Sequence, residues 1–143
     1  VQQSGKSTYE GVEMTADWAL GDRVNVAANY TYQDPKLSNG SREIRRPRHT
    51  LNMTVTASLS EKLTTNLSVL SVRDVIDTDL NAFPSVQVDL EDYNLVNFGA
   101  HYQINAYSKI QGKISNLLDD DYQTAYGFGS SDRSFNVGLR FDF

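Results

Sequence analysis

Four arginines stand close together in one stretch of the chain, at Arg42, Arg45, Arg46 and Arg48. A guanidinium donates paired hydrogen bonds to carboxylates and phosphates, so such a cluster could bind an anionic ligand group. The alternative is a solvated segment whose charge is balanced by nearby acids such as Glu43. We retain Arg45, Arg46 and Arg48 as candidate ligand-binding residues.

Two further groups of side chains could contact a ligand. Tyr126 and Phe128 could stack on a flat molecule, or they could pack within their own loop. The acids Asp74, Asp77 and Asp79 offer the oxygen ligands that Ca²⁺ prefers, but their spacing is not that of a calcium-binding loop. Solvated acids are therefore the favoured interpretation, and we expect neither a metal site nor a cofactor.

No arrangement of residues is typical of catalysis. The chain contains no GxSxG turn, no HExxH helix and no phosphate-binding loop. It also lacks Cys, which excludes thiol chemistry, disulfides and Cys-based metal centres. We expect His49 and His101 on the polar faces of strands, without a serine partner, and so predict no catalytic residue and no enzyme.

Composition narrows the possible partners. Hydrophobic residues make up 39% of the 143 residues, and the net charge of −5 argues against a nucleic-acid partner. The 8 Tyr, 6 Phe and 1 Trp argue against disorder. No apolar run reaches the length of about 18 residues that a membrane-spanning helix needs, although strands can cross a membrane with a much weaker signal.

The strongest pattern in the chain is alternation of apolar and polar residues, which predicts β-strands with one apolar face. It is clearest at the end of the chain, where Phe135, Val137, Leu139, Phe141 and Phe143 alternate with polar residues or Gly. Seven such segments are predicted, at residues 12–20, 24–32, 51–59, 63–73, 96–104, 107–118 and 135–143. The segment 63–73 is irregular, because its apolar residues occur in both phases.

The connections between these segments alternate in length. Short connections lie near residues 21–22, 60–62 and 105–106, and long ones span about 34–48, 74–91 and 119–133. Short turns on one side and long loops on the other are typical of a membrane β-barrel. A soluble β-sandwich is the alternative, and it does not explain the alternation.

Aromatic residues gather near both ends of the predicted strands, as expected where rings meet lipid headgroups. Near the short connections lie Trp18, Tyr102, Tyr107, Phe141 and Phe143, and near the long ones lie Tyr30, Tyr32 and Phe135. An odd number of antiparallel strands cannot close on itself, because the first and last strands run the same way. We therefore expect two open edges and a chain that is either part of a larger barrel or paired with another polypeptide.

Several motifs resemble TonB-dependent outer-membrane receptors. They are the run 116–122 (NLLDDDY), the run 126–128 (YGF), the run 132–135 (DRSF), the strand start 11–13 (GVE) and the run 45–50 (RRPRHT). The form of residues 121–127 (DYQTAYG) leans toward the cobalamin and ferric-siderophore branches of the family. The last strand is similar to the signal read by the outer-membrane assembly machinery, with Asn136, Gly138, Phe141 and Phe143 as its residues.

The resemblance implies an all-β fold: the last seven or so strands of an antiparallel up-and-down transmembrane barrel of about 22 strands. Residues 1–143 would be the C-terminal part of this barrel, without the earlier strands and the plug domain. The implied location is the bacterial outer membrane, and the implied function is TonB-dependent uptake of a siderophore-iron chelate or cobalamin.

The implied partners are membrane lipid and lipopolysaccharide, the assembly machinery, the remaining strands and the plug, with TonB engaged only through the missing N-terminal part. Two alternatives remain open. One is a structural or adhesin-like outer-membrane barrel without transport, and the other is a soluble β-sandwich binding module.

Overall fold

The computed structural model describes residues 7–142, and within that range every regular element is a β-strand. The strands are β1 (Thr8–Leu20), β2 (Val24–Lys36), β3 (His49–Ser58), β4 (Leu63–Arg73), β5 (Val75–Asp79), β6 (Val86–Leu90), β7 (Tyr93–Asn105), β8 (Ser108–Ser115) and β9 (Ser134–Phe141). A search of the described residues finds no helix with the length and hydrophobicity to cross a membrane.

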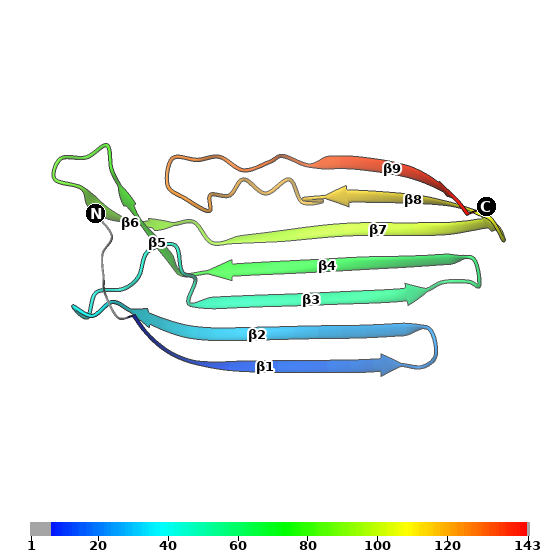
Figure 1. Cartoon of the computed structure of the whole chain (residues 1–143), viewed down its shortest axis with the longest axis horizontal. Helices are drawn as coiled ribbons and strands as arrows, with labels where there is room; N and C mark the ends of the chain where they lie inside the picture. The colour runs from blue at the N-terminus through cyan, green and yellow to red at the C-terminus, as the bar shows by residue number, and fades with distance from the viewer. Residues whose placement is uncertain (1–6, 143) are drawn as a thin grey trace.

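Seven strands form one sheet in the order β1-β2-β3-β4-β7-β8-β9, and each neighbouring pair is antiparallel (Figure 1). This confirms the predicted all-β architecture of about seven up-and-down strands. The hairpin β5–β6 was not predicted, because its strands of five residues each lie inside a connection that we expected to be a loop.

The short and long connections lie at opposite ends of the sheet, as the sequence predicted. Figure 1 shows the turns β1–β2, β3–β4 and β7–β8 on the right and the longer connections on the left. We call these the short-turn end and the long-loop end. Gly21, in the first short turn, has a φ of 67°, a left-handed conformation that glycine adopts without strain.

The strand register places apolar residues of all seven strands on one face of the sheet. One row across the strands consists of Trp18, Val26, Val55, Leu67, Phe98, Ile114 and Phe135. Directly opposed residues of antiparallel strands point to the same side, so this row lies on a single apolar face. On the outermost strand β9 the apolar side chains of this face are exposed, with Val137 78% and Phe135 69% accessible. An apolar surface of this extent is typical of contact with lipid.

This row also shows that the strands are staggered. It starts near the short-turn end of β1, at Trp18, and finishes near the long-loop end of β9, at Phe135. Figure 1 shows the same offset, with the short turns stepping outward from β1–β2 to β7–β8. Such stagger is expected of strands that tilt around a barrel axis.

The predicted placement of His49 on the polar face is wrong. The register pairs His49 with Tyr32 and Arg73, so its side chain lies on the apolar face, close to the long-loop end. There its Nδ1 is 2.7 Å from the Tyr30 hydroxyl oxygen, and this hydrogen bond satisfies both polar groups. His101 does lie on the polar face, where its register partners are Thr64 and Gln111.

A small buried cluster explains the irregular segment 63–73. Val72 and Tyr93 lie in the phase of the polar face, yet both are buried, together with Val75 and Leu90 of the β5–β6 hairpin. Partly buried Leu70, Leu95 and Tyr122 pack against this cluster. Leu70 and Val72 of β4 are thus apolar although they lie on the polar face, because loop segments cover that face at the long-loop end.

Candidate functional site

Three long connections meet at the long-loop end of the sheet. We call residues 37–48 the first loop, residues 74–92 (which include the β5–β6 hairpin) the second loop, and residues 116–133 the third loop. The candidate ligand-binding residues of the sequence all belong to the first and third loops. Contacts through the second loop decide how these residues are arranged.

Asp77 of the second loop joins all three loops. Its side chain is fully buried, and its Oδ2 accepts a hydrogen bond of 2.7 Å from the backbone N–H of Tyr126 in the third loop. Both carboxylate oxygens lie 3.0 Å from Nε of Arg45 in the first loop. The backbone N–H of Thr78 donates a further hydrogen bond to Oδ1. The expectation that Asp77 is a solvated acid is therefore wrong.

These contacts set the charge state of Asp77. Burial alone would raise the pKa of this carboxyl group, because a charge is poorly solvated in the protein interior. The hydrogen bonds from Tyr126, Arg45 and Thr78 outweigh that effect, and the pKa lies below its ordinary value. Asp77 is thus ionised at neutral pH and holds the three loops as a carboxylate.

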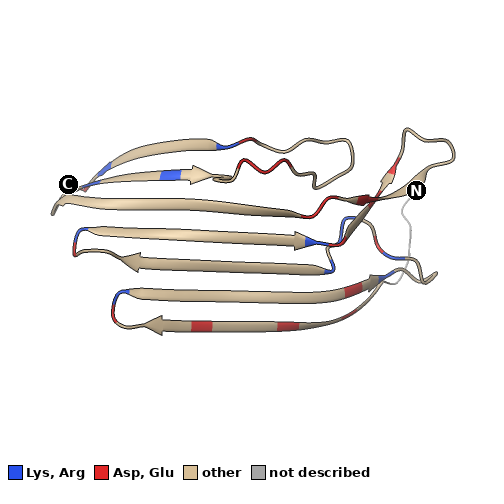
Figure 2. Cartoon of the chain, turned by 180° about the vertical axis from the view of Figure 1, so that it is seen from behind, with Lys and Arg blue, Asp and Glu red and all other residues tan. Residues whose placement is uncertain are grey.

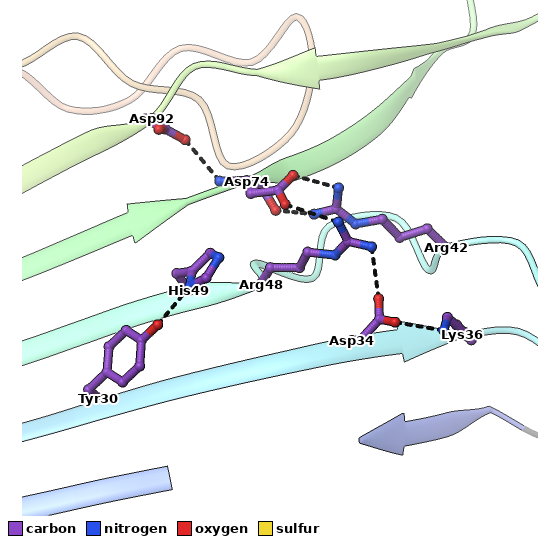
Figure 3. A network of polar contacts seen from close by, with 8 residues as sticks. All are labelled: Tyr30, Asp34, Lys36, Arg42, Arg48, His49, Asp74 and Asp92. Atoms are coloured by element: carbon purple, nitrogen blue, oxygen red, sulfur yellow. Dashed lines mark hydrogen bonds and ion pairs between the residues drawn. The ribbon is translucent and has the colours of Figure 1, made fainter. Parts of the chain in front are cut away.

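Asp74 forms a second junction between the first two loops (Figure 3). Its Oδ1 accepts a hydrogen bond of 2.6 Å from Arg42, which also donates to the backbone carbonyl of Asp74. Arg48 bridges the same carboxylate at 3.3 Å and Asp34 of β2 at 2.9 Å. Burial favours a higher pKa for Asp74, but the pairing with Arg42 and Arg48 prevails and lowers it.

All four arginines of the first loop contact acids of the chain itself. Arg46 lies 3.8 Å from Glu43, the acid that the sequence suggested as its balancing partner. The side chains of Arg45 and Arg46 nevertheless remain 49% and 54% exposed, so their other guanidinium N–H groups are accessible. Arg48 is more enclosed between its two carboxylates. Anion binding by Arg45, Arg46 and Arg48 remains a prediction.

A cavity of about 660 Å³ opens between the second and third loops. Its lining comprises Asp89, Leu90, Glu91, Asp121, Tyr122, Gln123, Tyr126, Gly129, Ser130 and Asp132. No Lys or Arg is among these residues, so the cavity has a negative potential and two tyrosine rings. A neutral or cationic group suits this lining better than an anionic one.

The structure separates the two predicted aromatic candidates. Tyr126 lines the cavity, and its backbone is bound to Asp77. Phe128 is 71% exposed and lies outside the cavity, beyond the turn that Gly127 forms with a φ of 81°. Asp89 and Glu91 were not predicted as site residues, and Tyr122 was named only within family motifs, because no local pattern links residues that come from separate loops. Their role, like that of Tyr126 and Phe128, is untested.

The structure offers nothing in the described residues that would hold a metal ion. No group of three or more His, Asp or Glu side chains lies within reach of one ion in residues 7–142. The three interlinked loops present exposed guanidinium groups, a cavity and aromatic rings.

Sequence comparison identifies related proteins. The family model for the β-barrel of TonB-dependent receptors matches residues 1–117. The vitamin B12 transporter BtuB of Vibrio cholerae is 30% identical over 139 residues, which are 96% of this chain and 22% of that protein. The chain therefore spans about a fifth of the length of this curated relative.

Solved structures share the fold. The ferripyoverdine receptor of the Pseudomonas aeruginosa outer membrane superposes with a TM-score of 0.84 at 23% identity, over 97% of this chain and 20% of that one. The ferric-catecholate import receptor Fiu of E. coli K12 does so with a TM-score of 0.82 at 18% identity, over 97% of this chain and 21% of that one. The chain thus belongs to the TonB-dependent receptor β-barrel family, whose place is the bacterial outer membrane.

Proposed function

We propose that this chain is the C-terminal wall of a receptor that imports a scarce metal chelate, either cobalamin or a siderophore-iron complex. The proposal rests on one combined observation. A sheet with an exposed apolar face, suited to lipid, carries three interlinked loops at one of its ends. The 30% identity to a vitamin B12 transporter supports cobalamin as the ligand. The fold shared with siderophore receptors is equally compatible with a siderophore-iron complex.

The rest of the proposed receptor lies outside this chain. Strands paired with the free edges of β1 and β9 would close the barrel, and a plug domain would fill its interior. TonB would engage the receptor through its N-terminal part. Lipid and lipopolysaccharide would surround the apolar face, with exposed rings such as Trp18 at its margin.

The three loops would contact the ligand outside the membrane. An anionic group of the ligand would meet the accessible guanidinium groups of Arg45 and Arg46 in the first loop, and Arg48 would add its partly exposed guanidinium group. A neutral or cationic part would enter the acidic cavity beside Tyr126. Phe128, exposed in the third loop but outside the cavity, would offer a ring for stacking.

Uptake assays test this proposal in a strain that lacks its own receptors for the ligand. Cells that produce the full-length receptor should accumulate labelled cyanocobalamin or ferripyoverdine, and only when TonB is present. Tyr126→Ala should reduce uptake, whereas Tyr107→Ala, at a more exposed ring of the short-turn end, should not. Absence of uptake of both ligands by a correctly inserted receptor would contradict the transport function and favour a structural role.

We also propose that β9 carries the assembly signal, through Asn136, Gly138, Phe141 and Phe143. Within the described residues, Phe141 projects from the apolar face and is 59% exposed, so a partner can reach it. Phe143 lies outside the described residues. Phe141→Ala should lower the amount of receptor inserted in the outer membrane, measured by surface labelling. Phe135→Ala, on the same face at the other end of β9, is the matched control, and equal insertion of both variants would refute the signal.

A further inference from the structure

The third loop lines the acidic cavity with two separate segments. The segment that leaves β8 contributes Asp121, Tyr122, Gln123 and Tyr126, and the segment that returns to β9 contributes Gly129, Ser130 and Asp132. We call residues 120–126 the outgoing wall and residues 129–132 the returning wall. Figure 2 shows acidic stretches in the third loop close to the ends of both β8 and β9. The shape of the cavity therefore depends on how far apart these two walls lie.

One buried side chain connects the two walls. Asn116 follows directly after β8 and is only 5% exposed. Its Nδ2 donates a hydrogen bond of 3.0 Å to the backbone carbonyl of Asp120 and one of 3.4 Å to that of Ser131. Its Oδ1 accepts a hydrogen bond of 3.0 Å from the backbone N–H of Asp120. A single amide group thus binds the backbone of both walls.

The backbone of Asn116 also joins the loop to the sheet. Its φ of 51° is left-handed, a conformation that Asn adopts more readily than most residues with a side chain. In this conformation its backbone N–H donates a hydrogen bond of 3.1 Å to Oδ1 of Asn97, a residue of β7. Asn116 therefore holds the walls relative to the sheet as well as to each other.

Two further contacts connect the legs of the third loop, and both are weaker ties. Asp119 accepts hydrogen bonds from the backbone N–H and the guanidinium of Arg133, but the two side chains are 46% and 39% exposed, so water competes for them. The backbone N–H of Tyr122 donates to the Ser130 hydroxyl at 3.3 Å. Loss of a buried hydrogen-bonding group costs more than loss of an exposed one, so removal of the Asn116 side chain should move the walls most.

We propose that Asn116 is a positioning residue for ligand recognition, which holds the two walls at the separation that fits the ligand. This inference rests on the proposed function, because it assigns the cavity to the ligand. Asn116 is not part of the cavity lining, so its effect reaches the ligand only through the walls. Without its side chain, binding of the ligand would also have to order the walls, and the affinity would fall.

The substitution Asn116→Gly tests the proposal. Glycine adopts a positive φ without strain, so the variant removes the side-chain hydrogen bonds and retains the backbone conformation. The intact receptor in outer-membrane fragments without TonB should bind its ligand, cyanocobalamin or ferripyoverdine, roughly tenfold more weakly. In uptake assays at equal surface levels, the half-saturating concentration should rise by the same factor, and the maximal rate should stay near that of the wild type. A purely structural role would lower the receptor level or the maximal rate instead.

Asn105→Gly is the matched control. Asn105 is exposed in the β7–β8 turn, at the short-turn end, and its Oδ1 accepts a hydrogen bond of 2.9 Å from the backbone N–H of Tyr107. The same substitution there should leave ligand affinity unchanged. Equal affinity of the wild type and the Asn116→Gly variant would overturn the inference.

The separation of the walls can be measured without any ligand. The chain has no Cys, so spin labels can be attached to cysteines introduced in place of Asp121 and Asp132, one on each wall. Pulsed electron resonance should give a longer or broader distance distribution in the Asn116→Gly receptor than in the receptor with Asn116. Identical distributions would refute the positioning role.

A second variant serves if Asn116→Gly does not insert into the membrane. Asn116→Asp retains the acceptor for the Asp120 N–H but places an oxygen where Nδ2 met two backbone carbonyls, so it should also separate the walls and weaken binding.

The two proposals fail in different ways. A wild-type receptor that binds neither ligand would contradict the transport function, while the spin-label distances would still decide whether Asn116 sets the walls. A receptor that imports its ligand with unchanged affinity after loss of the Asn116 side chain would uphold transport and refute the positioning role.

Discussion

At the scale of single residues, one buried carboxylate organises the candidate binding surface. Asp77 accepts hydrogen bonds from the first and third loops and from its own neighbour, and its side chain has no exposed surface. A buried charge is tolerated only when it is paired and hydrogen-bonded, and these contacts meet that condition. The positions of Arg45 and Tyr126 therefore depend on a residue that no ligand needs to touch.

The substitution Asp77→Asn tests this role. It preserves the shape of the side chain but removes its charge, so the bonds from Arg45 and Tyr126 should weaken by about 2 kcal/mol. Hydrogen exchange at the Tyr126 amide should then be faster by roughly tenfold or more. The matched control is Asp121→Asn, an exposed acid of the third loop. Equal protection of the amide in both variants would contradict the role of Asp77.

The same junction should depend on pH. The pKa of Asp77 in the folded protein lies below its ordinary value, so ionisation stabilises the junction above that ordinary value of about 3.9. This stabilisation is lost as the pH falls toward and through the lowered pKa. Protection of the Tyr126 amide should accordingly be constant near neutrality and decline only in acid, and Asp77→Asn should abolish the decline.

At the scale of elements, each strand separates an apolar face from a polar one. Met53 of β3 lies between Ala28 and Val69 on the apolar face, and the adjacent Asn52 lies between Asn29 and Leu70 on the other. Because side chains alternate along a strand, neighbouring residues face opposite sides of the sheet and therefore different surroundings. In the membrane these surroundings are the lipid and the barrel interior.

A charge placed on either face of β3 tests this assignment. Met53→Lys should destabilise the barrel by about 2–4 kcal/mol, as expected for a lysine facing the middle of the bilayer. Asn52→Lys, one residue away, should have a much smaller effect because its side chain reaches the interior. Denaturant-induced unfolding of the receptor in lipid vesicles measures both. Similar losses for the two variants would show that the faces are assigned wrongly.

At the scale of the whole molecule, the sheet has two unpaired edges and one uncovered apolar face. Within the described residues, β1 pairs only with β2 and β9 only with β8. Edge strands with free N–H and C=O groups invite pairing with other chains, and in lipid such groups cost several kcal/mol each. We therefore expect neighbouring strands to pair with both edges in the membrane.

The isolated chain 1–143 should consequently fail to remain monomeric in buffer without detergent. Its exposed edges and apolar side chains would associate, whereas a soluble β-sandwich would cover its apolar residues and stay monomeric. Light scattering coupled to size-exclusion chromatography distinguishes these outcomes. A stable monomer in plain buffer would contradict the membrane assignment of the apolar face.

Local sequence patterns were enough to predict the strands, their faces and the two ends of the sheet. Alternation of apolar and polar residues is a local property, so all seven long strands could be recognised, including β9 with its pattern from Phe135 onward. The lengths of the connections are also local, and they correctly separated short turns from long loops. His49 was misplaced because its polarity was given more weight than its position in the alternation of β3.

The way the loops are joined could not be predicted, because it depends on contacts between distant residues. Asp77, Arg45 and Tyr126 come from separate connections, and their contacts depend on how the strands bring those connections together. The same holds for the apolar cluster around Val72, which covers part of the polar face, and for the acidic cavity. Strand alternation is dictated by neighbouring residues, whereas a buried carboxylate among three loops depends on contacts between residues distant in sequence.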